Sequence, residues 1–285
     1  MSKALVLSGG GPLAVAWQCG LIAGLARSGI DLLDADFFLG TSAGAIVAAQ
    51  ITTGRNPVSL AEPILEESAH RPEEPPTLSY SRTAIARLPE LFAKAQTGDH
   101  GRIEVGAYAL EFFTPDSLVS YVNRMCSIVN AADSWPETIG IVTIETSSGK
   151  PKVLRSGCGV SLGTAVAASC SLPGLTPPVP ISGEYCMDGG LRSSANADLV
   201  GQFDTVLVIS FTPPGPVGLR MASRLTDQTD ELAAAGSDVL VIAPDDACLE
   251  AIGFQTMDFA RRPMIARQAI TQGVATASRL AEFWR

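Results

Sequence analysis

Short apolar runs of strand length alternate with longer stretches of helical length through the first 55 residues. Lys3–Leu7 has the length and apolar character of a buried strand, and three glycines follow it. Pro12 suits the first position of a helix, since that N–H has no partner within the helix, and the pattern continues to about Arg27. Phe37–Leu39 then predicts a second strand and Ala45–Thr52 a helix of small residues. This alternation predicts an α/β fold with a largely parallel central sheet.

The pattern changes between residues 56 and 134, where helical stretches are joined by loops. The expected helices are Val58–Ala69, Arg82–Lys94 and Asp116–Val129, and the expected loops are Arg71–Pro76 and Thr97–Gly106. We interpret residues 56–134 as a helical insertion that could form a lid or a substrate wall. In the absence of repeats or a linker, the whole chain, residues 1–285, is expected to be one domain.

Strand patterns return after residue 134. The expected strands are Thr138–Thr146, Lys152–Arg155, Val179–Ile181, Tyr185–Met187, Thr205–Phe211 and Val239–Ile242. Ser161 could cap a short helix over Leu162–Ser169, and the tail from Ala247 to Arg285 is expected to be mainly helical.

Composition narrows the class of protein. The 285 residues are 46% apolar and 17% charged, with a net charge of −9, which is typical of a globular protein. Because Lys and Arg do not cluster, we expect no nucleic-acid binding, and any transient membrane contact is expected to be apolar. We expect no secretory signal or membrane span, and six dispersed cysteines indicate a reducing, cytoplasmic setting. With only two histidines, no metal site is expected, and the sequence predicts no oligomeric state.

The first motif that could carry out catalysis is Gly40-Thr41-Ser42-Ala43-Gly44, a G-x-S-x-G between a predicted strand and a predicted helix. In that context the two glycines allow a sharp turn that exposes the serine hydroxyl at a helix N-terminus, as a nucleophile requires. The alternative is a glycine-rich turn in which Thr41 or Ser42 only caps the helix.

The second motif is Gly9-Gly10-Gly11, which lies between the first predicted strand and the first predicted helix. Its N–H groups could stabilise an oxyanion during acyl transfer. It could also be a plain turn, or the start of a dinucleotide fingerprint, because Gly9–Ala14 fits G-x-G-x-x-G/A. That fingerprint expects an acidic residue at the end of the second strand. The nearby acidic residues, Asp31, Asp34 and Asp36, precede that strand instead.

A serine nucleophile needs a base, and the sequence limits the choice. His70 and His100 both lie in the expected insertion, and no histidine follows them, so a carboxylate is the better candidate. Asp188, followed by Gly189 and Gly190, comes directly after an apolar strand. The alternative is that Asp-Gly marks a hairpin turn.

Taken together, the G-G-G loop, G-T-S-A-G and D-G-G have the order and roughly the separations found in patatin-like phospholipases. The stretch Ala167–Val179 resembles the family segment that precedes the base, and Val241–Ala247 is similar to a less specific one. The resemblance implies a three-layer α/β/α fold and hydrolysis of lipid-type or other acyl esters without a metal or other cofactor. It also implies that Ser42 is the nucleophile, Asp188 the base and the glycine loop the oxyanion hole.

The glycine loop departs from the family pattern. The family usually has G-G-G-x-Arg/Lys-Gly, whereas this chain continues with Pro12, Leu13 and Ala14. Proline has no N–H, so Gly10 and Gly11 are the expected donors, with Ala43 as a further candidate. The missing basic residue weakens the expectation of an anionic phospholipid substrate. Two alternatives therefore stay open: a dinucleotide-binding protein, and a catalytically silent patatin-like binding protein.

The expected chemistry also makes a demand on the base. A carboxylate of ordinary pKa is a weak base for a hydroxyl. Burial of Asp188 beside Cys186 and Met187 is expected to raise its pKa and improve proton transfer near neutral pH.

Overall fold

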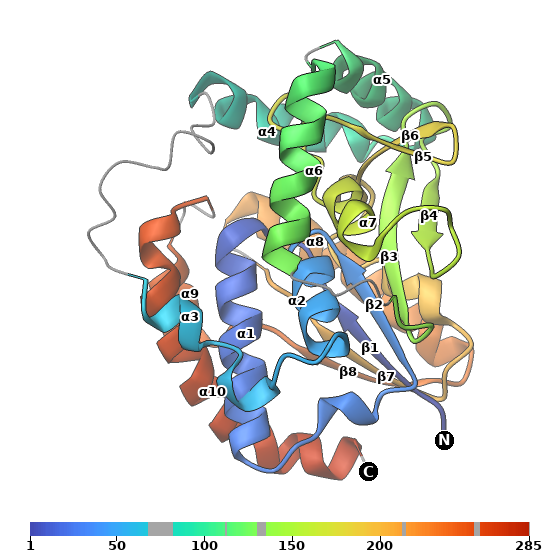
Figure 1. Cartoon of the computed structure of the whole chain (residues 1–285). Coiled ribbons are helices and arrows are strands. Elements are labelled where there is room, and N and C mark those ends of the chain that lie inside the picture. The colour runs from blue at the N-terminus through green and yellow to red at the C-terminus, as the bar shows by residue number, and fades with distance from the viewer. Residues whose placement is uncertain (68–81, 112, 130–134, 213–214, 254–256, 285) are drawn as a thin grey trace.

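A central sheet of mostly parallel strands, flanked by helices, organises the protein (Figure 1). The computed structural model describes residues 1–67, 82–111, 113–129, 135–212, 215–253 and 257–284. The strands are β1 (Lys3–Leu7), β2 (Phe37–Thr41), β3 (Ile139–Glu145), β4 (Pro151–Leu154), β5 (Val179–Ile181), β6 (Glu184–Asp188), β7 (Thr205–Ile209) and β8 (Asp238–Ile242). The predicted α/β class is therefore confirmed.

Helices connect these strands and cover the sheet. They are α1 (Gly11–Arg27), α2 (Ala43–Thr52), α3 (Glu62–Leu65), α4 (Arg82–Ala95), α5 (Asp99–Leu110), α6 (Pro115–Val129), α7 (Leu162–Ser169), α8 (Pro216–Ala234), α9 (Asp246–Ile252) and α10 (Arg262–Phe283). Short 3₁₀ helices lie at Leu32–Asp34, Pro57–Ser59, Gly189–Leu191, Ala197–Val200 and Phe259–Arg261. Among the described helices, none combines the length and the apolar run that crossing a bilayer requires.

The sheet has a parallel part and an antiparallel part. Its strand order is β5-β6-β3-β2-β1-β7-β8, and β4 pairs with β3. The pairs that join β3, β2, β1, β7 and β8 are parallel, whereas β4, β5 and β6 form antiparallel pairs. The carboxyl ends of the parallel strands share one edge, where ligands of open α/β sheets usually bind.

Successive residues of β1 point to opposite faces, and both faces are buried. Leu5 and Leu7 belong to a large core with residues of α1, α2, α7 and α10, whereas Ala4 and Val6 pack on the other face with residues of α8. Burial on both faces explains why the sequence shows continuous apolar strands rather than alternating ones.

The helices α3 to α6 lie between α2 and β3 in the chain, within the segment expected to be an insertion. In Figure 1, α4, α5 and α6 gather at the end of the molecule near β5, β6 and α7. In place of one helix over Val58–Ala69, the described residues form the 3₁₀ helix Pro57–Ser59 and the four-residue α3. Residues 68–81, which include the expected loop Arg71–Pro76, lie outside the described residues.

Two helices correct the sequence-based interpretation. The prediction that Thr97–Gly106 forms a loop is wrong for most of this segment, because α5 begins at Asp99. Its glycines permit close packing: a Cβ on Gly101 would lie 2.1 Å from the carbonyl oxygen of Lys94, and one on Gly106 would lie 2.7 Å from that of Thr146. The 19-residue helix α8 was not predicted at all.

Candidate active site

Ser42 occupies a sharp turn between β2 and α2. Its backbone has φ 52° and ψ −115°, a region that residues other than glycine rarely adopt. A Cβ on Gly44 would lie 2.0 Å from the carbonyl oxygen of Leu7, and one on Gly40 would lie 2.6 Å from the Cα of Ala45. Both glycines are therefore required for α2 to fold back tightly against β1 and β2. A strained conformation of this kind costs about 1–3 kcal/mol and needs support from its surroundings.

Ser169, the last residue of α7, supplies part of that support. Its Oγ accepts the backbone N–H of Ser42 at 2.8 Å and donates to the carbonyl oxygen of Val142 in β3 at 2.6 Å. The Ser169 side chain is fully buried, so water does not compete for these bonds. The hydroxyl thus ties the strained turn to the centre of the sheet.

The strands β2 and β6 approach each other end to end along one edge of β3. Thr41 pairs with Val142 in a parallel ladder, and Asp188 pairs with the next residue, Thr143, in an antiparallel ladder. Because β4 occupies the other edge of β3, β2 and β6 must share this edge. The end of β6 therefore points at the end of β2, where Ser42 follows.

This arrangement brings the two principal predicted residues together. Ser42 Oγ donates a hydrogen bond to Asp188 Oδ2 at 2.7 Å, although the residues are 146 positions apart. The other carboxylate oxygen, Oδ1, accepts the N–H of Gly190 at 2.7 Å. Only 1% of Asp188 and 9% of Ser42 is exposed. The pair is thus nearly closed to bulk water.

Burial controls the acidity of the carboxyl group. Desolvation raises the pKa of Asp188 from 3.8 to about 7, against the opposing effect of hydrogen bonds from Ser42 and Gly190. A carboxylate with this pKa can both accept and return a proton near neutral pH. The pKa of Asp188 is therefore raised, as expected from its position beside Cys186 and Met187, which are both fully buried.

Asp188 does not form a hairpin turn. It caps the 3₁₀ helix Gly189–Leu191, and the first glycine is held closely, because a Cβ there would lie 2.6 Å from the carbonyl oxygen of Val142. A Cβ on Gly190 would lie 3.0 Å from Asp188 Oδ1. The two glycines thus let the chain turn tightly around the carboxylate.

The glycine loop lies directly beside Ser42. A Cβ on Gly9 would lie 3.1 Å from the Cβ of Ser42, and the N–H of Gly9 is donated to the carbonyl of Ser194 at 2.8 Å. Gly10 (φ 148°) and Gly11 (φ 73°) adopt backbone conformations that favour glycine. They stand at the start of α1, where N–H groups lack acceptors within the helix. Since α2 begins immediately after Ser42, two helix N-termini flank the hydroxyl, and both favour negative charge there.

The other candidate groups lie elsewhere. His100 is on α5 with 88% of its side chain exposed, where its Nε2 lies 3.0 Å from Glu104, and His70 lies outside the described residues. Asp36, one of the acidic residues near β2, accepts the N–H of Lys3 at the opposite end of the strands from Ser42. In the part of the chain that the structure describes, no group of three or more His, Cys, Asp or Glu side chains could hold a metal ion.

Sequence reasoning assigned no role to three residues near this pair. Ser169 supports Ser42 as described above, and Asn196 contacts the neighbours of both residues, as shown below. Cys170 is the third: burial raises the pKa of its thiol well above 9.0, and the nearby Asp188 raises it further. Cys170 is therefore a neutral thiol rather than a second nucleophile at neutral pH. Ser169 and Cys170 lie in the family-like stretch Ala167–Val179, but the sequence does not reveal their contacts, because these come from distant segments.

Comparison with known proteins identifies the family of this chain. The model of the patatin-like phospholipase family matches residues 5–200, which is more than half of the chain and includes Ser42, Asp188 and the glycine loop. The chain belongs to the patatin-like phospholipase family. Membership in this family supports a lipid acyl hydrolase in general terms. Residues 201–285, with α8, α9 and α10, extend beyond the matched region.

Solved structures similar to this patatin-like chain are more distant. VipD from Legionella pneumophila matches 97% of the chain at 13% identity with a TM-score of 0.45, and the type III effector protein ExoU matches 98% at 15% identity with a TM-score of 0.42. The structure of SpcU in complex with ExoU from Pseudomonas aeruginosa matches at 17% identity with a TM-score of 0.34, and the match covers 96% of this chain and 53% of the matched chain. The chain spans 67% of VipD and 53% of ExoU. No curated protein matches the sequence significantly.

Proposed function

We propose that this patatin-like protein is a serine acyl hydrolase that cleaves carboxylic esters of the lipid type, with Ser42 as nucleophile and Asp188 as base. The observation that carries the proposal is the 2.7 Å hydrogen bond from Ser42 Oγ to Asp188 Oδ2, made in a nearly closed site. The strained turn at Ser42 adds support, because strain of this kind concentrates at functional sites.

In the proposed mechanism, Asp188 accepts the hydroxyl proton while Ser42 Oγ attacks the ester carbonyl carbon. The carbonyl oxygen becomes an oxyanion, which the N–H groups of Gly10 and Gly11 stabilise, with Ala43 as a further donor. The carbon–oxygen bond to the alcohol then breaks, and the departing alcohol takes the proton from Asp188. Water next gives a proton to Asp188 and attacks the acyl carbon, which releases the acid and returns the proton to Ser42. No metal or other cofactor takes part in these steps.

The substrate site is proposed to include the inserted helices. Leu91 and Ala95 of α4 pack with Met187 and Leu191, which flank Asp188 and its two glycines. A Cβ on Gly190 would also lie 3.9 Å from the ring of Phe92. We therefore propose that α4, which lies within the segment 56–134, forms one wall of the acyl-binding site within a single domain. The six free cysteines support the cytoplasmic location expected from the sequence.

The dinucleotide alternative lacks the acidic residue that it requires. The end of β2 carries Thr41 and Ser42, and Asp36 lies at the other end of the strand, bonded to Lys3. Titration with NAD or NADP should therefore give no measurable binding. A micromolar dissociation constant by calorimetry would favour the dinucleotide alternative over the hydrolase.

A fluorophosphonate probe tests the proposed function directly, since it reacts readily only with an activated serine. The folded protein should be labelled at Ser42, as located by peptide mapping, and should hydrolyse p-nitrophenyl esters in the presence of EDTA. Ser42→Ala should abolish both labelling and hydrolysis. As a matched control, Ser237→Ala removes a buried hydroxyl that contacts Phe203, and it should leave labelling intact. Labelling at another serine would refute the assignment, and no labelling of folded protein would favour the silent binding protein.

A further inference from the structure

Asn196 lies between the turn that carries Ser42 and the loop that carries Asp188. Its side chain is fully buried, and its Nδ2 donates to Thr41 Oγ1 and to the carbonyl oxygen of Gly189, both at 3.2 Å. Thr41 directly precedes Ser42, and Gly189 directly follows Asp188. A single amide group therefore contacts the chain neighbours of both residues.

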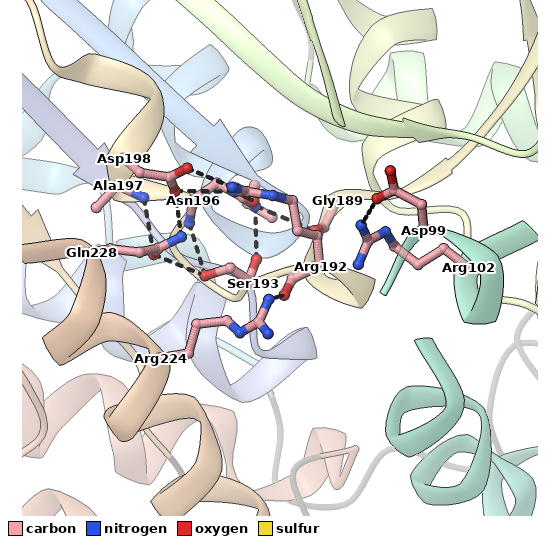
Figure 2. A network of polar contacts seen from close by, with 11 residues as sticks. Asp99, Arg102, Gly189, Arg192, Ser193, Asn196, Ala197, Asp198, Arg224 and Gln228 are labelled. Atoms are coloured by element: carbon pink, nitrogen blue, oxygen red, sulfur yellow. Dashed lines mark hydrogen bonds and ion pairs between the residues drawn. The ribbon is translucent and has the colours of Figure 1, made fainter. Parts of the chain in front are cut away.

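A polar network holds the Asn196 side chain in place (Figure 2). Its Oδ1 accepts a hydrogen bond from Arg192 Nη1 at 2.9 Å, and its Nδ2 also donates to the carbonyl oxygen of Ser193 at 2.7 Å. Arg192 forms an ion pair with Asp198, and Gln228 of α8 donates to the same carboxylate. The orientation of the Asn196 amide is thus fixed on its oxygen side by Arg192, which Asp198 holds in turn.

The backbone also suits asparagine at this position. Asn196 has φ 52° and ψ 38°, a left-handed conformation that asparagine tolerates better than most residues. Its N–H is bonded to Ser193 Oγ, which in turn donates to Gln228 Oε1 at 3.0 Å. Conformation and network therefore place the same amide group at the same point.

The Asn196 amide connects two strand ends that the sheet does not join to each other. β2 and β6 meet end to end, so the hydrogen bonds of the sheet join each of them to β3 and not to each other. The distance between Ser42 and Asp188 thus depends on two strand ends that β3 aligns but that share no backbone hydrogen bonds of the sheet. The Asn196 amide spans those ends, from Thr41 to Gly189.

We infer that Asn196 is a positioning residue that sets the separation between the nucleophile and its base. This inference rests on the proposed function, since it concerns the reaction of Ser42 with Asp188 as base. Within the described residues, Asn196 forms no hydrogen bond to Ser42 or to Asp188, so its effect on the reaction passes through Thr41 and Gly189.

The test compares turnover for each labelled active site, so that unfolded protein does not count. The concentration of active sites is measured by complete fluorophosphonate labelling, and kcat and KM are measured with a p-nitrophenyl ester. Asn196→Ala should lower kcat per site roughly 10- to 100-fold, as small displacements of reacting groups do, with little change in KM. A purely structural role would lower thermal stability and the labelled fraction but leave kcat per site unchanged.

A second pair of variants tests the hydrogen bond between Asn196 and Thr41 by changing its acceptor. Thr41 is fully buried at the end of β2, so Thr41→Val removes the Oγ1 acceptor while it keeps the shape and does not reach the substrate. It should lower kcat per site several-fold, and Thr41→Ser, which keeps the hydroxyl, should restore it. This pair keeps the test valid if Asn196→Ala does not fold.

Gln272→Ala is the matched control for the loss of a buried amide. Gln272 lies on α10 and bonds to Trp17 and Ala243, away from Ser42, so its loss should reduce stability and not kcat per site. The inference is overturned if wild-type protein is labelled and active while Asn196→Ala or Thr41→Val keeps kcat per site within two-fold of wild type. If wild-type protein is not labelled at Ser42, the proposed function fails first, and this inference fails with it.

Discussion

Ser42 and Asp188 stand at the ends of two strands that run toward each other along the same edge of β3, and their side chains meet at 2.7 Å. Both strand ends are fixed to adjacent residues, Val142 and Thr143. Ser169 connects the nucleophile side to Val142, and Asn196 connects the two ends across the gap. The Ser42–Asp188 pair is therefore positioned by the ends of two strands that β3 aligns.

Asp188→Asn should remove nearly all hydrolysis, because asparagine keeps the shape of the side chain and loses its basicity. General-base assistance is worth about 10²- to 10⁴-fold in rate, and kcat should fall by that factor in a protein whose circular dichroism spectrum is unchanged. The control replaces both histidines, His70→Gln with His100→Gln, and should keep most of the activity. An active Asp188→Asn protein beside an inactive histidine double variant would contradict the assignment of the base.

The rate should increase with pH and level off above neutrality. Asp188 must be ionised to accept a proton, and burial raises its pKa to about 7. The acidic limb of kcat/KM for a neutral ester should therefore have an apparent pKa near 7 and not near 4. A profile that is flat from pH 5 to 8 would show that this carboxyl group does not control the reaction.

The same carboxyl group should make the folded state less stable as the pH rises. The unfolded chain releases this proton near pH 4, whereas the folded protein keeps it until about pH 7, so the free energy of unfolding falls through that interval. Asp188→Asn removes this effect, at about 1.4 kcal/mol for each pKa unit. Denaturant unfolding should show the variant gaining stability over wild type between pH 4 and pH 8. An equal difference at both pH values would contradict the raised pKa.

Ser169→Ala should impair both stability and turnover. It leaves the N–H of Ser42 and the carbonyl of Val142 without their buried partner, at a cost of about 1–3 kcal/mol in the free energy of unfolding. The released turn should also lower kcat roughly ten-fold per labelled site, since the nucleophile is less well placed. Ser237→Ala should lose stability alone. Equal kcat values for the two variants would argue against a supporting role for Ser169.

Gly44→Ala should be strongly destabilising. Its Cβ would lie 2.0 Å from the carbonyl oxygen of Leu7, so α2 or β1 must shift, which costs roughly 1–3 kcal/mol or more. Gly201→Ala is the control, because its φ is −63° and a Cβ there would meet other atoms only at 3.9 Å. Thermal unfolding should show a lower midpoint for the first variant and little change for the second. A stable Gly44→Ala protein would mean that α2 can move away from β1.

The helices show where local patterns mislead. The glycines of α5 suggested a loop, but Gly101 and Gly106 serve close packing against Lys94 and Thr146. The unpredicted α8 begins at Pro216, directly after Gly215, and a Gly-Pro pair on its own resembles a loop. In both cases the helix is stabilised by contacts with distant segments, which a local pattern does not contain.

The sequence by itself determined the α/β class, because apolar runs, glycine turns and helix signals are local properties of the chain. It also predicted that Ser42 and Asp188 each follow a strand, and in the structure β6 includes Asp188 as its last residue. Only the tertiary structure decided that β6 runs antiparallel to β3 and stops opposite β2, which brings two residues 146 positions apart to 2.7 Å. It likewise decided the raised pKa of Asp188 and the roles of Ser169 and Asn196 in the contacts around it. Burial and cross-chain hydrogen bonds arise when strands pair, and strand pairing depends on the whole chain at once.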